Sequence, residues 1–411
     1  MKKLGLNPGG REAARRARRS IVAALALAAE TDRPWVSYSR SREWYAGGEH
    51  YPGCDYTYDT VVPAANDLIE AGLVEEVRGY ILRDGKGPQS RMRASALFLE
   101  RLGADLAVEH VAPRAPLIMK GEDGRLMPLP RTEQARRMLK GIEAANDGLR
   151  DIKVAISPKS LSENWEIGPR HWKARKVDDE GEITWAHVLP TPHQYATRIC
   201  GRGLLDAHGR LYAWWMGLPA ERRLELLIND DPVAEPDFEC IHADLLYSIA
   251  GVKRAHNPYE TGVHLRKYGK LAFFVGVNAD GGREGAVRAI AHHPTWRKEW
   301  KLSYGYAGEV YDAILRHNAT ISHFFGSDAG VHLMGIDSRM CLKVLKGCRR
   351  AGIPCLPVHD SFIVPRQHKG TVQGIMEEVL HETRVGISPG TSNTSVKNIL
   401  HARRACLSAS V

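Results

Sequence analysis

Hydrophobic positions in the first quarter of the chain recur with helical spacing. Apolar residues between positions 61 and 69 lie at i, i+4, i+7 and i+8, which predicts an amphipathic helix. We expect Thr60 to cap this helix and Pro63 to lie in its first turn, where a missing N–H is tolerated. Gly72 is expected to end it.

Two short strands and a second helix are predicted after this helix. Residues 73–77 and 91–94 read as strands, and the Gly-rich stretch 79–87 between them predicts a turn. Ser95 is then expected to cap a helix that continues through Leu102.

The N-terminus carries a basic segment in front of an apolar run. Residues 1–20 hold seven Lys and Arg against one acidic residue, Glu12, and the apolar run over 21–29 is nine residues long. A membrane span needs about 20 apolar residues, so the chain is not expected to be an integral membrane protein. A secretory signal is the alternative, but we favour a basic tail over 1–19 followed by a helix capped by Ser20. Such a tail suits phosphate contact or is a solvated arm.

The order helix, strand, turn, strand resembles the winged helix-turn-helix domains of replication and regulatory proteins. The resemblance implies a winged-helix DNA-binding domain over residues 20–105. Its helix would offer Thr60 and Asn66 to DNA, and a winged helix that contacts only protein is the alternative. The wing would offer side chains suited to phosphates or a minor groove: Arg83, Lys86, Gln89, Arg91 and Arg93.

The middle of the chain gives weaker patterns. Four prolines over 106–131 indicate a linker, 132–150 is a helical stretch, and 152–156 predicts a short strand. The organisation of 157–200 does not follow from its Trp-, His- and Pro-rich composition. We therefore expect residues 106–200 to be a linker and a helical, thumb-like region.

Two later segments each present an aspartate at the end of an apolar strand. In the first, an apolar strand leads to Asp237, and a helix is expected to begin near Ile241. In the second, IPCLPVHDSFIVP over 353–365, apolar runs flank His359 and Asp360 as in a hairpin with polar residues at its tip.

A third segment lies between these two. Arg266, Lys270, Phe274 and Asn278 recur every four residues and would share one stripe of a helix. Two cations and an aromatic ring on one stripe suit a triphosphate and a base.

Two aspartates from separate elements suit phosphoryl transfer by two divalent ions. Such ions lie about 3.5–4 Å apart and stabilise the attacking hydroxyl and the leaving pyrophosphate. Mg²⁺ takes few protein carboxylates because substrate phosphates complete its coordination. Asp237 and Asp360 are therefore the predicted catalytic residues and metal ligands for two Mg²⁺ or Mn²⁺ ions.

In order and spacing, the three segments resemble motifs A, B and C of family A nucleic-acid polymerases, the group of DNA polymerase I and the single-subunit phage RNA polymerases. Asp237 matches motif A, Arg266, Lys270 and Phe274 match motif B, and His359-Asp360-Ser361-Phe362 matches motif C of the phage enzymes. The resemblance covers about residues 210–380. It implies an α+β right-hand core with palm and fingers over 201–385, preceded by the winged helix and followed by a tail over 386–411.

Two positions depart from the family pattern. Asn278–Ala279 stands where the family has Tyr–Gly, and His242 stands where the DNA enzymes have Glu. Those positions help the family judge the sugar 2′ position, so the choice between dNTP and NTP does not follow. His242 and Asn278 are expected to bind nucleotide, as a polar gate.

Further candidates surround the three motifs. Arg210, Arg222 and Arg223 precede motif A and would touch template or triphosphate, or else form a solvated basic face. By resemblance, His359 contacts the primer terminus. We expect Asp337 to have a surface or capping role.

Charge and cysteine content narrow the function classes. There are 57 Lys and Arg against 48 Asp and Glu, a formal net charge of +9, which favours a polyanionic partner such as DNA. The seven cysteines include no C-x-x-C pair, which argues against a zinc site and favours a reducing cytoplasm. No G-x-S-x-G or P-loop motif occurs, and a 3′–5′ exonuclease reading of Asp237-x-Glu239 leaves the other motifs unexplained.

The expected function is thus template-directed nucleotidyl transfer from nucleoside triphosphates on a DNA template. The pairing with a winged helix suggests replication or priming of a plasmid, phage or mobile element. The alternative from another class is a non-catalytic DNA-binding initiator or regulator with a degenerate polymerase fold. A third possibility is template-independent terminal transfer.

Overall fold

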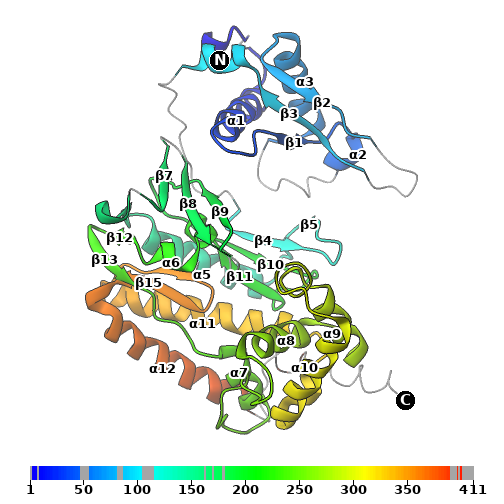
Figure 1. Cartoon of the computed structure of the whole chain (residues 1–411). Coiled ribbons are helices and arrows are strands. Elements are labelled where there is room, and N and C mark those ends of the chain that lie inside the picture. The colour runs from blue at the N-terminus through cyan, green and yellow to red at the C-terminus, as the bar shows by residue number, and fades with distance from the viewer. Residues whose placement is uncertain are drawn as a thin grey trace.

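The computed structural model describes residues 2–6, 9–46, 55–80, 87–103, 115–161, 163–168, 171–177 and 181–388, together with Val396 and Ile399. The described chain is a mixed α+β structure (Figure 1). Its buried apolar side chains fall into two clusters, one between Leu4 and Leu102 and the other between Leu117 and Ile399.

The N-terminal cluster is built from helices around a small antiparallel sheet of order β1-β3-β2. Its elements are η1 (Lys2–Leu4), α1 (Glu12–Ala29), β1 (Val36–Tyr38), α2 (Arg42–Tyr45), α3 (Tyr58–Glu70), β2 (Val74–Val77), β3 (Ser90–Ala94) and α4 (Ala96–Leu102). The sequence correctly predicts α4, since the Ser95 hydroxyl accepts a hydrogen bond from the N–H of Phe98 at 3.2 Å. The positive φ of Gly72, just past the end of α3, agrees with its predicted role as a helix stop.

Two predicted helix starts are wrong. Helix α1 begins at Glu12, so Ser20 lies inside it and residues 12–19 are not a separate basic tail. Ala and Arg are both strong helix formers, and Arg18 is held by an ion pair to Asp67 at 2.6 Å.

Helix α3 begins at Tyr58, with Thr57 rather than Thr60 as its N-cap. Thr60 instead occupies the third helical position, where its hydroxyl accepts a hydrogen bond from the N–H of Thr57 at 2.9 Å. Pro63 consequently lies inside the helix rather than in its first turn, on the exposed side.

The larger cluster contains the remaining elements. The strands are β4 (Leu117–Lys120), β5 (Leu126–Met127), β6 (Val154–Ile156), β7 (Trp165–Ile167), β8 (Trp172–Val177), β9 (Ile183–Val188), β10 (Thr197–Cys200), β11 (His208–Tyr212), β12 (Leu226–Ile228), β13 (Asp231–Ala234), β14 (Leu356–Val358) and β15 (Ser361–Pro365). The helices are α5 (Glu133–Leu149), α6 (Ala220–Arg223), α7 (Ile241–Ile249), α8 (Arg266–Asn278), α9 (Gly282–His292), α10 (Tyr304–His317), α11 (Gly330–Arg350) and α12 (Lys369–Ile387). Short 3₁₀ turns and one π-helical turn, Thr295–Glu299, join some of them.

The central sheet of this part has five antiparallel strands in the order β14-β15-β13-β12-β6. Every residue of β14 and β15 is buried, which explains why this hairpin reads as a continuous apolar run in the sequence. Helix α11 packs against α12, α5, α7 and α8, and Figure 1 shows α11 and α12 running side by side beneath the sheet.

Residues 115–131 hold β4 and β5 and are not a linker, which corrects that expectation, whereas the helix predicted over 132–150 and the strand predicted over 152–156 are found as α5 and β6. Strand β4 pairs in parallel with β10, and β6 forms one edge of the central sheet. Strands β7, β8 and β9 form a separate antiparallel sheet. The partners of β4 and β6 lie some 70–80 residues later in the chain, a non-local pairing that local patterns do not reveal.

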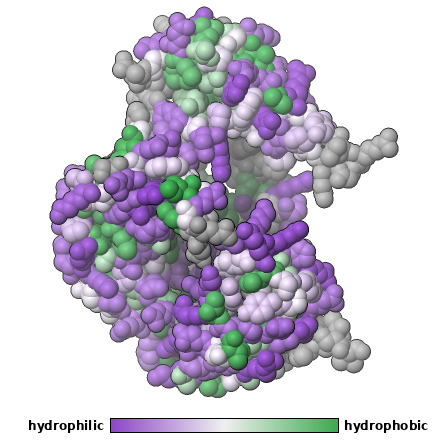
Figure 2. All heavy atoms as spheres, in the orientation of Figure 1, coloured by the Kyte–Doolittle hydropathy of each residue, from purple (hydrophilic) through white to green (hydrophobic). Residues whose placement is uncertain are grey.

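Contacts between histidines and carboxylates connect the two clusters. His171 and His187, from the β7–β9 sheet region, lie 3.2 Å from Glu30 and Asp32 respectively, just after α1. On the face seen in Figure 2, hydrophilic residues dominate and hydrophobic ones form small separate patches. No helix among the described residues is long and apolar enough to cross a membrane.

Candidate active site

Two aspartates that are 123 residues apart in the sequence lie side by side. Asp237 follows β13, and Asp360 is at the tip of the β14–β15 hairpin. The N–H of Phe238 donates to the carbonyl of Asp360 at 3.0 Å, and the N–H of Phe362 donates to the carbonyl of Pro236 at 3.0 Å. These backbone bonds extend the sheet by one bridge, between Asp237 and Ser361, so Asp237 and Asp360 lie at the same end of it.

The environment of the two carboxylates is strongly acidic. Partial burial raises the pKa of Asp237, and the charges of Asp360, Glu239 and Glu235 raise it further. Among the described residues, neither Asp237 nor Asp360 forms an ion pair with a basic side chain. A bound cation would therefore relieve a repulsion that the described chain leaves in place.

A neighbouring glutamate is locked in position. Glu235 accepts two hydrogen bonds from Arg223, at 2.9 and 2.8 Å, and one from the Ser361 hydroxyl at 2.6 Å. Arg223 thus holds Glu235, and Glu235 binds Ser361 of the hairpin that carries Asp360. Arg222 forms an ion pair with Glu225. Both arginines therefore pair with glutamates of this chain instead of forming a solvated basic face.

A buried ion pair lies behind the aspartates. Arg210 donates from Nε to the Asp337 carboxylate at 3.0 Å, and His242 Nε2 lies 2.9 Å from the same carboxylate. Asp337 is only 3% exposed. Burial acts to raise the pKa of Asp337, but the hydrogen bond with His242 and the charge of Arg210 outweigh burial and lower it. Asp337 is therefore not a surface or capping residue, which corrects the expectation from the sequence.

Helix α8 is present over the predicted range and places its stripe beside this network. The Phe274 ring meets His242 at 5.8 Å and Tyr259 at 5.7 Å between centroids. The Arg266 guanidinium lies 5.6 Å from the Tyr259 ring, and both Arg266 and Lys270 are exposed. Arg266 and Phe274 both contact Tyr259, and Phe274 also contacts His242. His242 in turn shares the Asp337 carboxylate with Arg210.

Asn278, at the end of the same stripe, is committed to packing. Its Nδ2 donates to the carbonyl of Phe274 at 2.7 Å. A Cβ added at Gly330 would lie 2.2 Å from Asn278 Oδ1, so only glycine fits at the start of α11. Asn278 and Phe274 also line a shallow pocket of about 300 Å³ with His293 of the following segment.

His359 occupies a strained position at the hairpin tip. Its φ of 56° lies in the left-handed region, and its ring packs edge-on against Tyr212 at 5.7 Å. Its Nδ1 is buried without a hydrogen-bond partner in the described structure. Burial lowers the pKa of His359, and the charge of Arg210 lowers it further, while the charges of Asp360 and Asp337 act in the opposite direction.

The residues expected to bind DNA lie in the N-terminal cluster. Thr60 is used in the capping box, and Asn66 accepts a hydrogen bond from Arg40 at 2.9 Å. Exposed positions on α3 include Asp59, Pro63 and Glu70.

On β3, the guanidinium groups of Arg91 and Arg93 lie 5.2 and 4.9 Å from the Trp35 ring. Gln89, just before this strand, is exposed. Arg83 and Lys86 lie outside the described residues.

Sequence reasoning missed Asp337, Tyr259 and Glu235 as parts of the site. Asp337 carried a faint signal, since it is an acidic residue inside a helix whose neighbours Ile336 and Met340 are apolar. Nothing in the local sequence distinguishes Tyr259, whose buried ring lies between Arg266 and Phe274. No group of three or more His, Cys, Asp or Glu side chains in the described ranges has the arrangement of a metal site.

Comparison with known proteins does not identify a family. No protein-family model matches this sequence, and a search of curated proteins found no match.

Proposed function

We propose that this chain is a template-directed nucleic-acid polymerase whose catalytic carboxylates are Asp237 and Asp360. The observation that carries the proposal is their apposition at one end of an antiparallel sheet, beside a helix with two exposed cations. In this proposal the five-stranded sheet corresponds to a family A palm, and α8 to α10 correspond to the fingers.

The donor set fits hard divalent cations. Asp237 and Asp360 offer carboxylate oxygens, the ligands that Mg²⁺ and Mn²⁺ prefer, and burial together with the charge of Asp360 raises the pKa of Asp237. Two such ions, when bound, would activate a 3′ hydroxyl and stabilise the leaving pyrophosphate. Two protein carboxylates are enough because the phosphates of the substrate supply further ligands.

The other residues bind and orient the substrate. Arg266 and Lys270 lie one helical turn apart on the exposed side of α8 and would neutralise the triphosphate. Phe274, the next residue on this stripe, would border the sugar and base, and the buried His242 packs against its ring from behind. Because Asp337 holds His242 and Arg210 in fixed positions, this side of the site is preorganised.

We propose that the N-terminal cluster is a winged-helix DNA-binding domain that brings the catalytic part to its template. The support is a three-stranded sheet with helices, and the basic patch that Arg91 and Arg93 of the central strand form around Trp35, where Arg93 also pairs with Glu75 at 2.6 Å. The exposed positions of α3 are partly acidic, so the contacts proposed here come from β3 and Gln89 rather than from α3.

The same basic patch of Arg91 and Arg93 favours a second candidate function. A chain that binds DNA through Arg91 and Arg93 without catalysis would be a replication initiator or regulator. The two functions differ in one respect, because only an enzyme loses an activity when Asp237 or Asp360 is replaced while DNA binding is retained.

Nucleotide incorporation on primed and unprimed single-stranded DNA tests the proposal. Labelled dNTPs or NTPs are supplied separately with Mg²⁺ or Mn²⁺, and product sequence is compared with the template. We expect templated product from the unchanged protein and a loss of at least about 100-fold in Asp237→Ala, the scale of removing one positioned electrostatic group. Asp231→Asn removes a carboxylate of the same sheet that, within the described ranges, accepts a side-chain hydrogen bond from Gln367 at 3.2 Å, and it serves as the matched control.

A further inference from the structure

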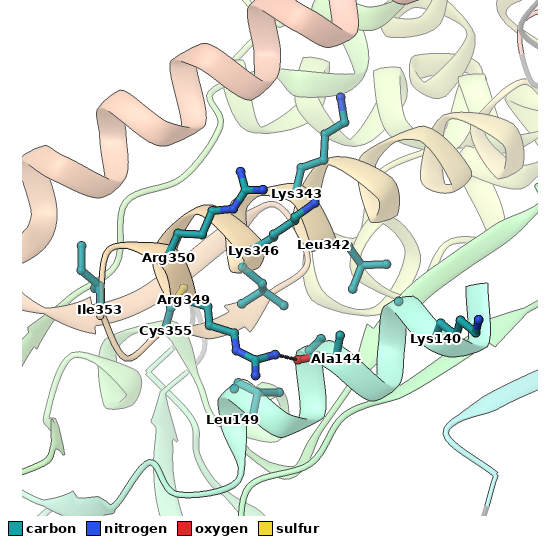
Figure 3. Close-up of a pocket in the computed structure, with 14 residues that line it drawn as sticks. Lys140, Ala144, Leu149, Leu342, Lys343, Lys346, Arg349, Arg350, Ile353 and Cys355 are labelled. Atoms are coloured by element: carbon teal, nitrogen blue, oxygen red, sulfur yellow. Dashed lines mark hydrogen bonds between the residues drawn. The ribbon is translucent and has the colours of Figure 1, made fainter. Parts of the chain in front are cut away.

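A groove between α5 and α11 lies outside the candidate active site. It has a volume of about 700 Å³, and Figure 3 shows residues of both helices lining it. Lys346, on its rim, is nine residues from Asp337 along α11, which places the two side chains on opposite sides of that helix. The groove therefore does not belong to the Arg210–Asp337–His242 network.

The floor of the groove is apolar. Leu149 of α5 and Leu342 and Leu345 of α11 form its walls, and Ala144 and Ala145 form its base. Ala144 is exposed, so an apolar partner can reach the base of the groove. Removing such a surface from water is favourable, at about 25 cal/mol per Å².

The rim, in contrast, carries one sign of charge. Its charged residues are Lys140, Lys343, Lys346, Arg349 and Arg350, all exposed, and no Asp or Glu of the described ranges lines the groove.

Part of this charge is already engaged. Lys343 pairs with Glu382 at 2.8 Å, and Arg349 donates to the carbonyl of Ala144 at 2.9 Å. Lys140, Lys346 and Arg350 form no ion pair with a described residue. Three cations thus face solvent around an apolar floor.

We propose that this groove docks an acidic amphipathic helix of a partner protein. Leucine-like side chains of such a helix would fill the floor, and its carboxylates would meet Lys140, Lys346 and Arg350. Because the groove combines a basic rim with an apolar floor, a matching ligand carries acidic and apolar side chains on the same helix.

Other occupants fit less well. Among the residues that the structure describes, no aromatic side chain lines the groove, so these residues offer no ring on which unpaired bases could stack. The chain beyond residue 388 contains Lys397, Arg403 and Arg404 but no Asp or Glu, so this basic segment would be repelled by the rim. The proposal does not depend on the polymerase activity.

Fluorescence anisotropy with a designed peptide tests the proposal on the full chain. The probe is a fluorescein-labelled helix of about 16 residues, with leucines spaced i, i+3, i+4 and i+7 and glutamates on the opposite face. One control peptide has lysine for every glutamate, and another keeps the composition but scrambles the leucine spacing. We expect saturable binding of the first peptide only.

Variants of the protein locate the binding. Lys346→Glu with Arg350→Glu should weaken binding of the peptide at least about 10-fold, because two of the three rim cations without an ion pair to a described residue become anions. Ala144→Trp should weaken it by filling the floor without changing charge. Lys176→Glu with Lys253→Glu, an equal charge change at exposed sites away from the groove, should have little effect.

Several outcomes would overturn the proposal. Equal binding of the scrambled peptide, or equal loss in the Lys176→Glu and Lys253→Glu protein, would reduce it to general charge attraction. A labelled single-stranded oligonucleotide that binds in competition with the peptide and is lost in Lys346→Glu with Arg350→Glu would identify a nucleic-acid site instead. Self-association in sedimentation that disappears in Ala144→Trp would identify a second copy of the chain as the occupant.

Discussion

Replacing Asp337 by Asn tests whether the buried ion pair behind the aspartates holds the fold of the site. Asp337 is 3% exposed and accepts from Arg210 at 3.0 Å and His242 at 2.9 Å. Asn keeps an oxygen acceptor but removes the charge. Charge-assisted hydrogen bonds contribute about 1.5–3 kcal/mol, and leaving one charge of a buried pair uncompensated costs about 3–5 kcal/mol. We expect Asp337→Asn to lower the free energy of unfolding by about 3 kcal/mol at pH 7.

The dependence of this loss on pH follows from the lowered pKa of Asp337. A carboxyl whose pKa is lower in the folded state stabilises the fold fully above its unfolded-state pKa, about 3.9. That stabilisation is lost as pH falls through the folded-state pKa. The difference between the two proteins should therefore be constant from about pH 7 to 5 and shrink below about pH 4.

Urea denaturation followed by tryptophan fluorescence measures the effect at each pH. The matched control is Asp312→Asn, which removes a carboxylate bound by Arg283 on the surface at 2.7 Å, where a pair contributes about 0–1 kcal/mol. If Asp337→Asn lowers the free energy of unfolding no more than Asp312→Asn does, the buried pair does not stabilise the fold as proposed. A difference that grows as pH falls below 4 would also contradict this.

Three further predictions follow from contacts in the structure. Gly330→Ala should destabilise the protein by about 1–3 kcal/mol because the added methyl overlaps Asn278, whereas Gly374→Ala in α12, where the space is open, should be neutral or stabilising; chemical denaturation compares them. Ser95→Ala should cost about 1 kcal/mol through the lost N-cap of α4, read as a lower thermal midpoint, and Ser95→Thr should retain most of the stability. Glu239→Gln should lower the pKa of Asp237, because it removes one like charge while burial and Asp360 continue to raise that pKa. Carboxyl ¹³C NMR measures the pKa, and an unchanged value would contradict the placement of Glu239 near Asp237.

Local sequence patterns predicted the elements that carry the candidate site. Helix α8 was expected over 266–279 and is found at Arg266–Asn278, and α7 begins at Ile241 as expected. The β14–β15 hairpin places His359 and Asp360 at its tip, as its two apolar runs predicted. These elements have a strong periodicity or a fully buried strand, which is where local patterns carry most information.

The remaining features depend on contacts between distant segments. The burial of Asp337 depends on Arg210 and His242, which lie 127 and 95 residues away. Strand β4 exists because β10 and β5 pair with it. The start of α1 was misplaced because an Arg-rich helix has the same composition as a basic tail.

The most direct measurement for the central claim is single-nucleotide incorporation by Asp360→Asn on a primed template, paired with DNA affinity. We predict that the unchanged protein and Asp231→Asn extend the primer in step with the template base. Asp360→Asn should bind the same DNA equally well but extend it at least about 100-fold more slowly. Undiminished extension by Asp360→Asn, or no extension by the unchanged protein while DNA binding persists, would contradict the assignment of Asp237 and Asp360 as catalytic carboxylates.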